Sequence, residues 1–479
     1  MKRILFLVPP PLDGKPVTER VFGCNYGIYA QPNIFFLYPA TIVKKAGYDV
    51  EFLDFPALKK TSLDFVRHFQ SNTYDVIVFY SVFLSINTDL KAREIIKETC
   101  FETKYIFIGT EPTANPEKFL DDCSVIIRGE SELTIVETLE SFERKLNLSE
   151  VKGVTFLENG KMVKNSPRGI IENLDSLPIP DRKLLGIGEY MNPKLSRTPF
   201  TGMIISRGCP FRCIFCVPNS LSFAREIESK KESNWRKPLP RTSSIDHIRE
   251  ELSEIAKMGF KSISFYDDQF VMGIDRTLAV CEVMKEFRFE WSCLSRADSL
   301  LEPRLTQAMA LSGCRYVDIG VESFDSQILR DIKKDLRIED IELAINNVKK
   351  SGMEAEINIL LGASPIETTR SIEATFQKAL RLNVDYVLFS ICTPFPFTDF
   401  HLLAKERKWM LESEYKGIDP MKESFLNLPN LSKSRLEKII RSLYFRFYFR
   451  PSFLLKTLRK VGSFSDFWRK FKAGMSLYR

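Results

Sequence analysis

Three cysteines in the middle of the sequence are the residues best suited to carry chemistry. Cys209, Cys213 and Cys216 follow the apolar run 203–205, which predicts a strand with the cysteines on the loop that leaves it. Thiolates are the usual ligands of iron–sulfur clusters, and a four-iron cluster normally takes four of them. A loop that supplies three thiolates therefore predicts a 4Fe-4S cluster with one iron open to a ligand from outside the protein.

Two ordinary explanations for clustered cysteines fit this sequence less well. Disulfides need an oxidising compartment, and no signal peptide is recognisable at the start of the sequence. A structural zinc site takes four ligands in paired spacing, but His68, His247 and His401 all lie far from the loop. The remaining cysteines are scattered, and we expect core thiols at Cys24, Cys100, Cys123, Cys281, Cys293, Cys314 and Cys392.

The chain after the cysteines predicts a repeated strand–helix pattern. Strands are expected at 262–266, 290–293, 316–320, 354–361 and 386–391, separated by helices at 243–258, 274–286, 302–312, 338–351 and 366–381. With the strand before the cysteines, this makes six β/α units. We expect a curved, partial barrel with ligand groups on the loops at the carboxyl ends of the strands.

Charged residues recur at these predicted carboxyl ends. Asp267 and Asp268 follow one strand, Arg296 follows the next, and Glu322 follows a third. One such residue alone is explained by an ordinary ion pair. A series on the same rim as the cysteines is harder to explain by structure alone and predicts a binding site there.

The first part of the chain predicts a second α/β unit. Strands at 2–8, 50–54, 74–81, 105–109 and 124–129 alternate with helices at 37–47, 62–71, 87–99 and 132–146. This pattern predicts a Rossmann-like, doubly wound parallel sheet, whose ligands bind beyond the carboxyl ends of its strands. Simple nucleotide binding is one alternative, although neither a G-x-G-x-x-G nor a Walker A pattern follows the first strand.

The cysteine spacing, with Phe215 before the last cysteine, resembles the loop of the radical S-adenosylmethionine (SAM) superfamily. The resemblance implies that Cys209, Cys213 and Cys216 ligate the cluster and that the open iron chelates the methionine part of SAM. Electron transfer then cleaves SAM to a 5′-deoxyadenosyl radical. Phe215 would lie against the adenine.

The same resemblance assigns the charged rim to SAM. Asp267 and Asp268 stand where the family holds the amino group, Arg296 would face the carboxylate or a neighbouring acid, and Glu322 would contact the ribose or the amino end. Two turns depart from the family pattern. Gly-x-Pro-Gly-Glu-Thr is replaced by Gly-Ala-Ser-Pro-Ile-Glu-Thr at 362–368, and Pro-Phe-Pro-Gly by Pro-Phe-Pro-Phe at 394–397.

The N-terminal segments resemble the cobalamin-binding domain that precedes the barrel in one large subfamily, the class B radical SAM methyltransferases. The proline-rich end of the first strand, 109–114 and 128–132 carry the resemblance, although Thr110 replaces a usual glycine. The implied cobalamin-binding residues are Pro10, Ser81, Gly109, Thr110, Glu111, Gly129 and Glu130. Because residues 1–67 contain no histidine, we expect no histidine of this domain on the lower face of cobalamin.

These interpretations divide the chain into four parts. We expect a cobalamin-binding domain at 1–150, a linker at 151–198, a partial barrel at 199–410 and a helical, basic and aromatic domain at 411–479. The linker contains a predicted hairpin at 154–163 and a proline-stiffened segment at 174–181. Two long loops have open roles. Residues 20–36 are functional or pack between domains, and residues 220–242 border the substrate entrance or are a solvated excursion.

The net charge of +7 is unevenly distributed. Residues 432–479 alone carry +11, so the rest of the chain is slightly acidic and no nucleic-acid-binding face is expected. The tail interleaves aromatic and basic residues, which fits either a helical cap on the barrel or peripheral contact with a membrane surface. We favour the cap. No apolar run is long enough to span a membrane, and we expect a cytoplasmic protein, with membrane association through the tail as the alternative.

The sequence thus predicts a cobalamin-dependent radical SAM enzyme, with C-methylation of an unactivated carbon as the expected reaction. Its expected cofactors are a 4Fe-4S cluster, S-adenosylmethionine and cobalamin, and its expected partner is an electron donor of the flavodoxin or ferredoxin type. Two alternatives remain, namely a non-methylating radical cyclisation or rearrangement and an iron–sulfur electron-transfer or binding protein. The substrate is a small molecule, lipid-like if the tail is a guide, with a tetrapyrrole or a peptide left open.

Overall fold

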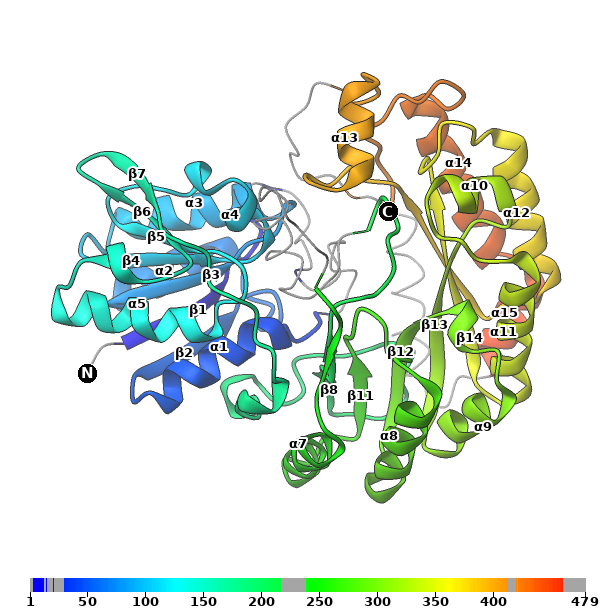
Figure 1. Ribbon diagram of the computed structural model, residues 1–479, viewed down its shortest axis with the longest axis horizontal. Coiled ribbons are helices and arrows are strands. Elements are labelled where there is room, and N and C mark those ends of the chain that lie inside the picture. Colours follow the sequence, from blue (N-terminus) through cyan, green and yellow to red (C-terminus); the bar gives the residue numbers. More distant parts are fainter. Residues whose placement is uncertain are drawn as a thin grey trace.

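The computed structural model describes residues 3–12, 14, 20, 30–216, 238–411, 419 and 421–459. The described parts form two α/β units side by side, with their sheets on either side of a central region (Figure 1). Cys24 and most of the loops 20–36 and 220–242 lie outside the described residues, as does the end of the tail.

The N-terminal unit is built on a seven-stranded sheet in the order β2-β1-β3-β4-β5-β6-β7. Five strands are parallel: β1 (Arg3–Val8), β2 (Asp49–Asp54), β3 (Val76–Tyr80), β4 (Lys104–Ile108) and β5 (Ser124–Ile127). This confirms the predicted doubly wound parallel sheet. The order reverses between β1 and β3, which is where such sheets open a crevice for ligands.

The hairpin expected in the linker belongs to this sheet. β6 (Val154–Glu158) and β7 (Lys161–Lys164) are antiparallel to each other, and β6 pairs with β5. Helices cover both faces: α1 (Ile34–Lys45) and α5 (Glu132–Arg144) lie on one, and α2 (Ser62–Ser71) and α3 (Ile86–Lys97) on the other. The loop predicted to run to Phe36 ends earlier, because the Asn33 side chain accepts a hydrogen bond from Phe36 N and caps α1.

The second unit is an open, curved sheet of six parallel strands with helices on its outer face (Figure 1). Its strands are β8 (Phe200–Met203), β11 (Ser262–Phe265), β12 (Glu290–Arg296), β13 (Cys314–Glu322), β14 (Glu354–Leu361) and β15 (Tyr386–Ile391). Its outer helices are α7 (Ile245–Lys257), α8 (Ile274–Phe287), α9 (Pro303–Leu311), α11 (Ile338–Lys350) and α12 (Thr369–Arg381). The predicted partial barrel is confirmed.

The strand before the cysteines lies earlier than the sequence predicts. β8 ends at Met203, and the apolar residues Ile204 and Ile205 are buried outside any strand. The backbone amide of Ile205 is instead bound by the Asp267 side chain. A short antiparallel pair follows, in which β9 (Ser206–Arg207) pairs with β10 (Arg241–Thr242).

The two units share one apolar core. Phe200, Ile204 and Tyr316 of the barrel are buried in the same cluster as Leu174 and Tyr190 of the linker and the face of the N-terminal sheet under α1 and α5. The barrel interior is tight here, since a Cβ atom on Gly202 would lie 2.2 Å from the ring of Tyr266. The units are therefore joined by packing as well as by the chain.

The linker also fills the barrel from the side of its amino ends. Asn192 donates hydrogen bonds to Ser264 Oγ at 3.1 Å and to Tyr316 Oη at 2.8 Å. Lys194 forms an ion pair with Glu356, and its ammonium lies 4.8 Å from the centroid of the Tyr316 ring. The open side of the barrel is thus the side of its carboxyl ends.

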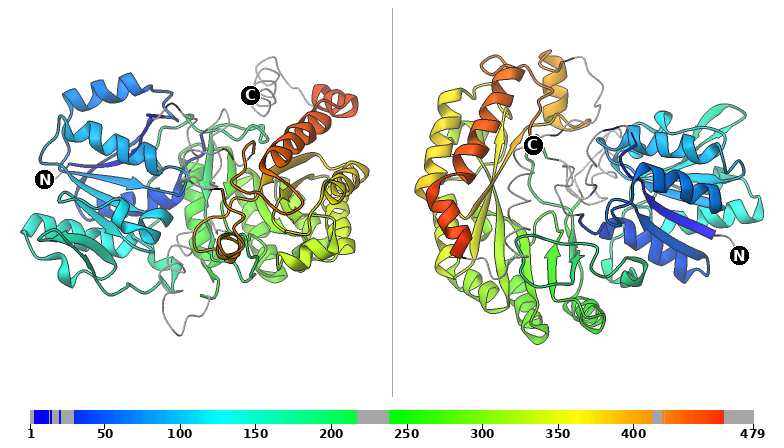
Figure 2. Two further views of the ribbon diagram at one scale, coloured as in Figure 1. Left: turned by 90° about the horizontal axis from the view of Figure 1, so that it is seen from above. Right: turned by 180° about the vertical axis from the view of Figure 1, so that it is seen from behind.

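The C-terminal part contains α13 (Asp399–Glu406), α14 (Lys433–Tyr448) and α15 (Pro451–Arg459), and α14 runs along the outside of the barrel (Figure 2). Leu436, Ile440 and Phe447 of α14 are buried against the barrel core, as the cap interpretation predicts. Phe445 and Phe449 face outward and are 51% and 42% exposed. None of the described helices is both long and apolar enough to cross a membrane.

Candidate functional site

The three cysteines lie on one loop that the barrel holds at several points. Gly208 N donates to Asp268 Oδ2 at 3.0 Å, Ile214 N donates to Ile332 O at 3.1 Å, and Phe400 N donates to Ile214 O at 3.0 Å. Cys216 keeps an exposed surface, yet desolvation by the surrounding protein raises the pKa of its thiol, and the neighbouring Cys213 and Cys209 raise it further. Three thiolates at one place repel each other unless a cationic centre compensates their charge, which fits a metal cluster.

Three thiols on one loop match the protein ligands of a four-iron cluster that keeps one iron open. Within the described ranges, no three His, Cys, Asp or Glu side chains converge closely enough to hold one metal ion. A cubane cluster makes no such demand, because each thiolate ligates its own iron.

The cysteines expected to be core thiols agree with that role where they are described: Cys100, Cys281, Cys293, Cys314 and Cys392 are buried and Cys123 is half-buried.

Asp267 and Asp268 hold the segment that leads into the cysteine loop. Asp267 Oδ1 accepts hydrogen bonds from Ile205 N at 3.1 Å and from Ser206 Oγ at 2.5 Å, while its Oδ2 has no partner among the described residues. Burial raises the pKa of Asp267 to about 7. Asp268 binds the Gly208 amide. Both carboxylates are thus beside the cluster loop, and their contact with SAM stays a prediction.

Arg296 lies directly beside the cysteine loop. Its guanidinium stacks 3.7 Å from the centroid of the Phe211 ring, and its Nη1 is 3.9 Å from Cys213 Sγ. Its Nε and Nη2 donate to the two carboxylate oxygens of Asp298 at 3.1 and 3.0 Å. The acid that faces Arg296 is therefore Asp298, and a contact with the SAM carboxylate stays a prediction.

Glu322 ends β13 in an uncommon backbone conformation, with φ +68°. The register between β13 and β14 shifts between Gly320 and Glu322, a bulge that redirects the Glu322 side chain. Its Oε1 accepts a hydrogen bond from Lys334 Nζ at 2.9 Å, and both side chains are at most 10% exposed. Phe215 is half-buried against the barrel core. Glu322 and Phe215 thus lie on the cluster side of the barrel, and their contacts with SAM stay predictions.

The residues predicted to bind cobalamin all follow β1, β3, β4 or β5 at their carboxyl ends. Pro10 is buried, and the buried Ser81 Oγ donates to Asp89 Oδ2 at 2.6 Å. Gly109 has φ +109°, and a Cβ atom there would lie 2.4 Å from Ser81 O. Only glycine allows the chains after β3 and β4 to approach so closely, and we call this close approach at the edge of the sheet the Gly109 cradle.

The next residues begin α4 (Thr110–Ala114), so Thr110 in place of glycine is accommodated as its first helical residue. Glu111 is 1% exposed, and burial raises its pKa to about 7. Its Oε1 accepts from Asn115 and Lys118, whereas Oε2 has no partner within the described part of the chain. An unpaired carboxyl oxygen at this edge is a suitable hydrogen-bonding group for a ligand.

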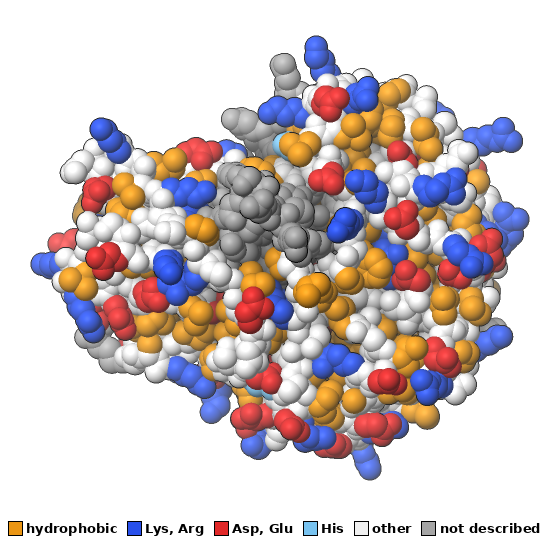
Figure 3. Space-filling model, viewed as in Figure 1, with side chains coloured by type: hydrophobic (Ala, Val, Ile, Leu, Met, Phe, Trp, Pro, Cys, Tyr) orange, Lys and Arg blue, Asp and Glu red, His pale blue; other side chains and the backbone are white. Residues whose placement is uncertain are grey.

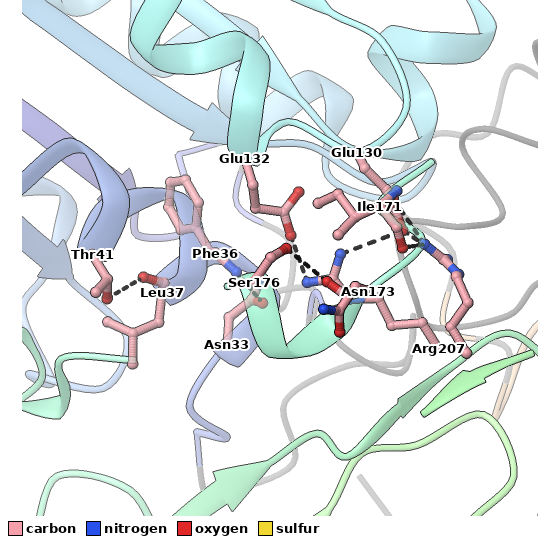
Figure 4. A network of polar contacts seen from close by, with 11 residues as sticks. Asn33, Phe36, Leu37, Thr41, Glu130, Glu132, Ile171, Asn173, Ser176 and Arg207 are labelled. Atoms are coloured by element: carbon pink, nitrogen blue, oxygen red, sulfur yellow. Dashed lines mark hydrogen bonds and ion pairs between the residues drawn. The ribbon is translucent and has the colours of Figure 1, made fainter. Parts of the chain in front are cut away.

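Gly129 and Glu130 follow β5, and their contacts differ. Gly129 N donates to Thr113 Oγ1 at 3.1 Å, which ties the loops after β4 and β5 together. The Glu130 carboxylate is directed toward the barrel, where it pairs with Arg207 and Arg241. Gly129 therefore lies at the edge of the sheet, after β5, and Glu130 lies at the boundary between the units (Figure 4).

The carboxyl ends of the two sheets face each other. Phe83, which follows β3, and Ala114 of α4 form a small apolar cluster with Phe395 and Phe397, which follow β15. The Phe83 and Phe395 rings are 5.8 Å apart between centroids. Phe397, where the family pattern has glycine, keeps a glycine-like φ of +67°. The predicted cofactor edges of both units thus border one region.

Several residues of this region were not predicted from the sequence. Arg207, Arg241 and Glu132 form a buried ionic network with Glu130. Lys334 and Asp298 pair with the predicted residues Glu322 and Arg296. A weak signal existed for Arg207, because a charged residue directly between an apolar run and the cysteines must be neutralised if it is buried.

Comparisons with known proteins agree with this geometry. The sequence model of the radical SAM superfamily matches residues 203–379. An uncharacterized methyltransferase of Pyrococcus horikoshii is 30% identical over 95% of this chain and 94% of its own length. The hopanoid C-3 methylase of Methylococcus capsulatus is 26% identical over 75% of this chain and 66% of its own length.

A solved structure has the same overall fold. The radical SAM methyltransferase TsrM of Kitasatospora setae, solved with cobalamin and a [4Fe-4S] cluster bound, superposes with a TM-score of 0.69 over 99% of both chains at 12% sequence identity. The superposition includes both α/β units, so the similarity of fold extends beyond the barrel.

Proposed function

Because this chain belongs to the radical SAM superfamily and is methyltransferase-like over its whole length, we propose that it is a cobalamin-dependent enzyme that methylates an unactivated carbon. The observation that carries the proposal is the meeting of the two sheets at Phe83 and Phe395. A substrate in the region between them would have the cysteine loop on one side and the Gly109 cradle on the other.

The residues of the chain divide the work between the two edges. Cys209, Cys213 and Cys216 would hold the 4Fe-4S cluster, and the residues after β3 and β4 would hold cobalamin. When bound, the reduced cluster supplies the electron that cleaves SAM and cobalamin carries the methyl group. The protein orients these groups, and the apolar contact between Phe83 and Phe395 excludes water from part of the boundary.

The surroundings of the cluster loop fit SAM as its partner. Arg296 and Lys334 place two cations beside it, and Asp267, Asp268 and Glu322 place three carboxyl groups there. A zwitterion with a carboxylate and an amino group finds partners of both signs in such a site. We assign the SAM contacts to Phe215, Asp267, Asp268, Arg296 and Glu322, and the two aspartates also hold the loop.

The wider setting of the reaction is also part of the proposal. The substrate is a small molecule or lipid-like compound, and an external flavodoxin or ferredoxin supplies electrons. Lys and Arg are interspersed with Asp and Glu over the face in Figure 3, so that face shows no continuous basic patch of the kind that a nucleic acid binds. The basic tail would add a salt-sensitive membrane contact, which co-sedimentation of full-length protein with anionic vesicles tests.

Methylation can be tested without knowing the substrate. Anaerobic protein with a reconstituted cluster, cobalamin, SAM and a reductant should form S-adenosylhomocysteine, the product left when SAM gives up its methyl group, in amounts that depend on cobalamin. It should also form 5′-deoxyadenosine. Formation of 5′-deoxyadenosine without cobalamin-dependent S-adenosylhomocysteine would contradict methylation and favour a radical cyclisation. Formation of neither would indicate an electron-transfer or binding protein.

A further inference from the structure

A buried ionic network joins the cluster loop to the N-terminal sheet (Figure 4). Arg207 Nη2 donates to Glu132 Oε1 at 2.5 Å, and Arg207 Nη1 lies 3.4 Å from Glu130 Oε1. Arg241 Nη1 and Nη2 donate to the two oxygens of Glu130 at 3.0 and 2.8 Å. Two arginines of the barrel unit therefore face two glutamates of the other unit, and their charges balance.

The network is completely enclosed. Arg207, Glu130 and Glu132 have side chains that are at most 1% exposed, and that of Arg241 is 6% exposed. Glu130 Oε2 also accepts from Ile171 N at 2.6 Å. Enclosed charges hold their partners firmly, because separating them leaves an uncompensated charge in a medium of low dielectric constant.

The place of Arg207 in the chain gives the network a role beyond stability. Arg207 comes two residues before Cys209, and β9 pairs it directly with Arg241 at the far end of the segment that includes the cluster loop. All hydrogen-bond partners that the structure gives to the Arg207 guanidinium lie in the N-terminal unit. The start of the cluster loop is therefore anchored to the other unit through Arg207, in addition to its contacts with Asp267 and Asp268 of its own barrel.

The other end of the network lies at the predicted cobalamin edge. Glu130 follows Gly129 at the end of β5, and Glu132 is the first residue of α5. Gly129 is in turn bound to Thr113 of α4, beside the Gly109 cradle. A continuous chain of described contacts thus runs from Cys209 through Arg207 and the loop after β5 to the edge that would carry cobalamin.

Resting on the proposed function, we propose that Arg207, Glu130, Glu132 and Arg241 are positioning residues that fix the spacing between the cluster loop and the cobalamin edge. The positioning role requires no contact of these side chains with either cofactor. Their effect is exerted through the backbone of the two loops that they join. Loosening the network is expected to let the two edges move relative to each other while each cofactor still binds.

The test uses the two cofactors as magnetic probes. In holoprotein with a reduced cluster and cob(II)alamin, both centres are paramagnetic, and their spin–spin interaction in the electron paramagnetic resonance spectrum depends steeply on their separation. Arg207→Lys keeps the charge but cannot bridge both glutamates, since lysine has no planar fork. Glu132→Gln keeps the shape and removes the charge. Both variants should load iron and cobalamin like the wild type yet show a changed or broadened interaction.

Glu251→Gln is a matched control. Glu251 forms a buried ion pair with Arg182 at 2.5 Å, both side chains are 1% exposed, and the pair joins the linker to α7. The Glu251→Gln variant should be less stable than the wild type but should show the same spin–spin interaction. Hydrogen exchange of apoprotein gives a second readout, in which Arg207→Lys and Glu132→Gln, but not Glu251→Gln, should accelerate exchange in residues 204–208.

The outcomes separate this proposal from the proposed function. A wild-type protein that takes up no cobalamin contradicts the proposed function. If the wild type binds both cofactors but Arg207→Lys and Glu132→Gln show the same spin–spin interaction and the same hydrogen exchange as the wild type, the positioning role is overturned. The proposed function is then unaffected. A change of equal size in Glu251→Gln also overturns the positioning role, since the effect would then follow from general destabilisation.

Discussion

Tyr444 of α14 satisfies the backbone of Phe389 on the edge strand β15. Its hydroxyl accepts a hydrogen bond from Phe389 N at 3.1 Å and donates one to Phe389 O at 2.6 Å. Tyr448, one helical turn later, makes the same pair of bonds with Val387, at 3.1 and 2.8 Å. Two side chains thus replace the neighbouring strand that an edge strand lacks, which protects this edge from pairing with another molecule.

Tyr444→Phe should therefore destabilise the protein although it keeps the ring. The change leaves a buried amide and carbonyl unpaired, at a cost of about 1–3 kcal/mol. Thermal unfolding should show a lower midpoint and faster aggregation. Phe445→Leu, on the exposed side of the same helix, should have little effect. Equal stability of Tyr444→Phe and the wild type would show that the edge needs no such protection.

Cys213→Ala should prevent assembly of the cluster. Anaerobically reconstituted wild-type protein is expected to bind about four iron atoms per chain at this loop. The control is Cys281→Ala, which removes a fully buried core thiol and should keep the iron while losing some stability. Iron analysis and the iron–sulfur charge-transfer absorption measure the cluster content of both variants. Unchanged iron in Cys213→Ala, or a protein that takes up only zinc, would contradict the cluster assignment.

Gly109→Ala should impair cobalamin binding while leaving the cluster intact. The added Cβ would lie 2.4 Å from Ser81 O, so the chains after β3 and β4 must separate. Gly47→Ala is the control, because Gly47 also has a positive φ of +95° but a Cβ added there would meet no atom within 4 Å. The amount of cobalamin that stays with each variant during gel filtration, measured by its absorption, distinguishes Gly109→Ala from Gly47→Ala. Loss of cobalamin from both variants would point to backbone strain rather than to the cradle.

Glu367→Gln should change how stability depends on pH. Burial raises the pKa of Glu367 to about 8, against the hydrogen bond from Gly362 N, which lowers it. The folded protein keeps a proton that the unfolded chain loses, so stability falls as the pH rises from about 4.5 to about 8. The slope for one group is at most about 1.4 kcal/mol per pH unit.

Glutamine cannot titrate. The melting temperature of Glu367→Gln minus that of the wild type should therefore increase as the pH rises through this window. Glu282→Gln, at a site that is 67% exposed on its side chain, serves as the control and should follow the wild type. Parallel curves for Glu367→Gln and the wild type would mean that Glu367 is ionised in the folded protein.

Phe397→Gly should be more stable than Phe397→Ala. Both variants lose the ring contact with the Phe83 cluster, but only glycine adopts φ +67° without the steric cost of about 1–2 kcal/mol that a Cβ brings. At the helical position Phe445 the order should reverse, with alanine about 1 kcal/mol more stable than glycine. Denaturation midpoints of the four variants check the reversal.

The sequence predicted the architecture because buried parallel strands leave continuous apolar runs between amphipathic helices. It placed the strand before the cysteines too late, since Ile204 and Ile205 are as apolar as a strand. The backbone of Ile205 is held by Asp267, 62 residues away along the chain. An apolar run shows that a segment is buried, but not which groups satisfy its backbone.

The candidate site was predicted unevenly for a similar reason. The cysteine spacing is a local pattern, so it is visible in the sequence. The partner of Arg207 is Glu132, 75 residues away, and no local pattern marks such a pair. Glu130 illustrates the other limit. Its position at a strand end predicted a cobalamin contact, which stays a prediction, but no local pattern marks the two arginines of the other unit that its carboxylate binds.

The apolar core that the two units share limits how they could be exchanged between proteins. It contains Phe200, Ile204 and Tyr316 of the barrel and Leu174 and Tyr190 of the linker. A barrel cut free at residue 199 would expose these side chains to water, at about 25 cal/mol for each Å² of apolar surface. The N-terminal unit therefore cannot be removed without exposing apolar side chains of the barrel. An exchange of the N-terminal unit of this chain would have to replace the linker as well, together with the barrel side chains Phe200, Ile204 and Tyr316 that pack in the shared core.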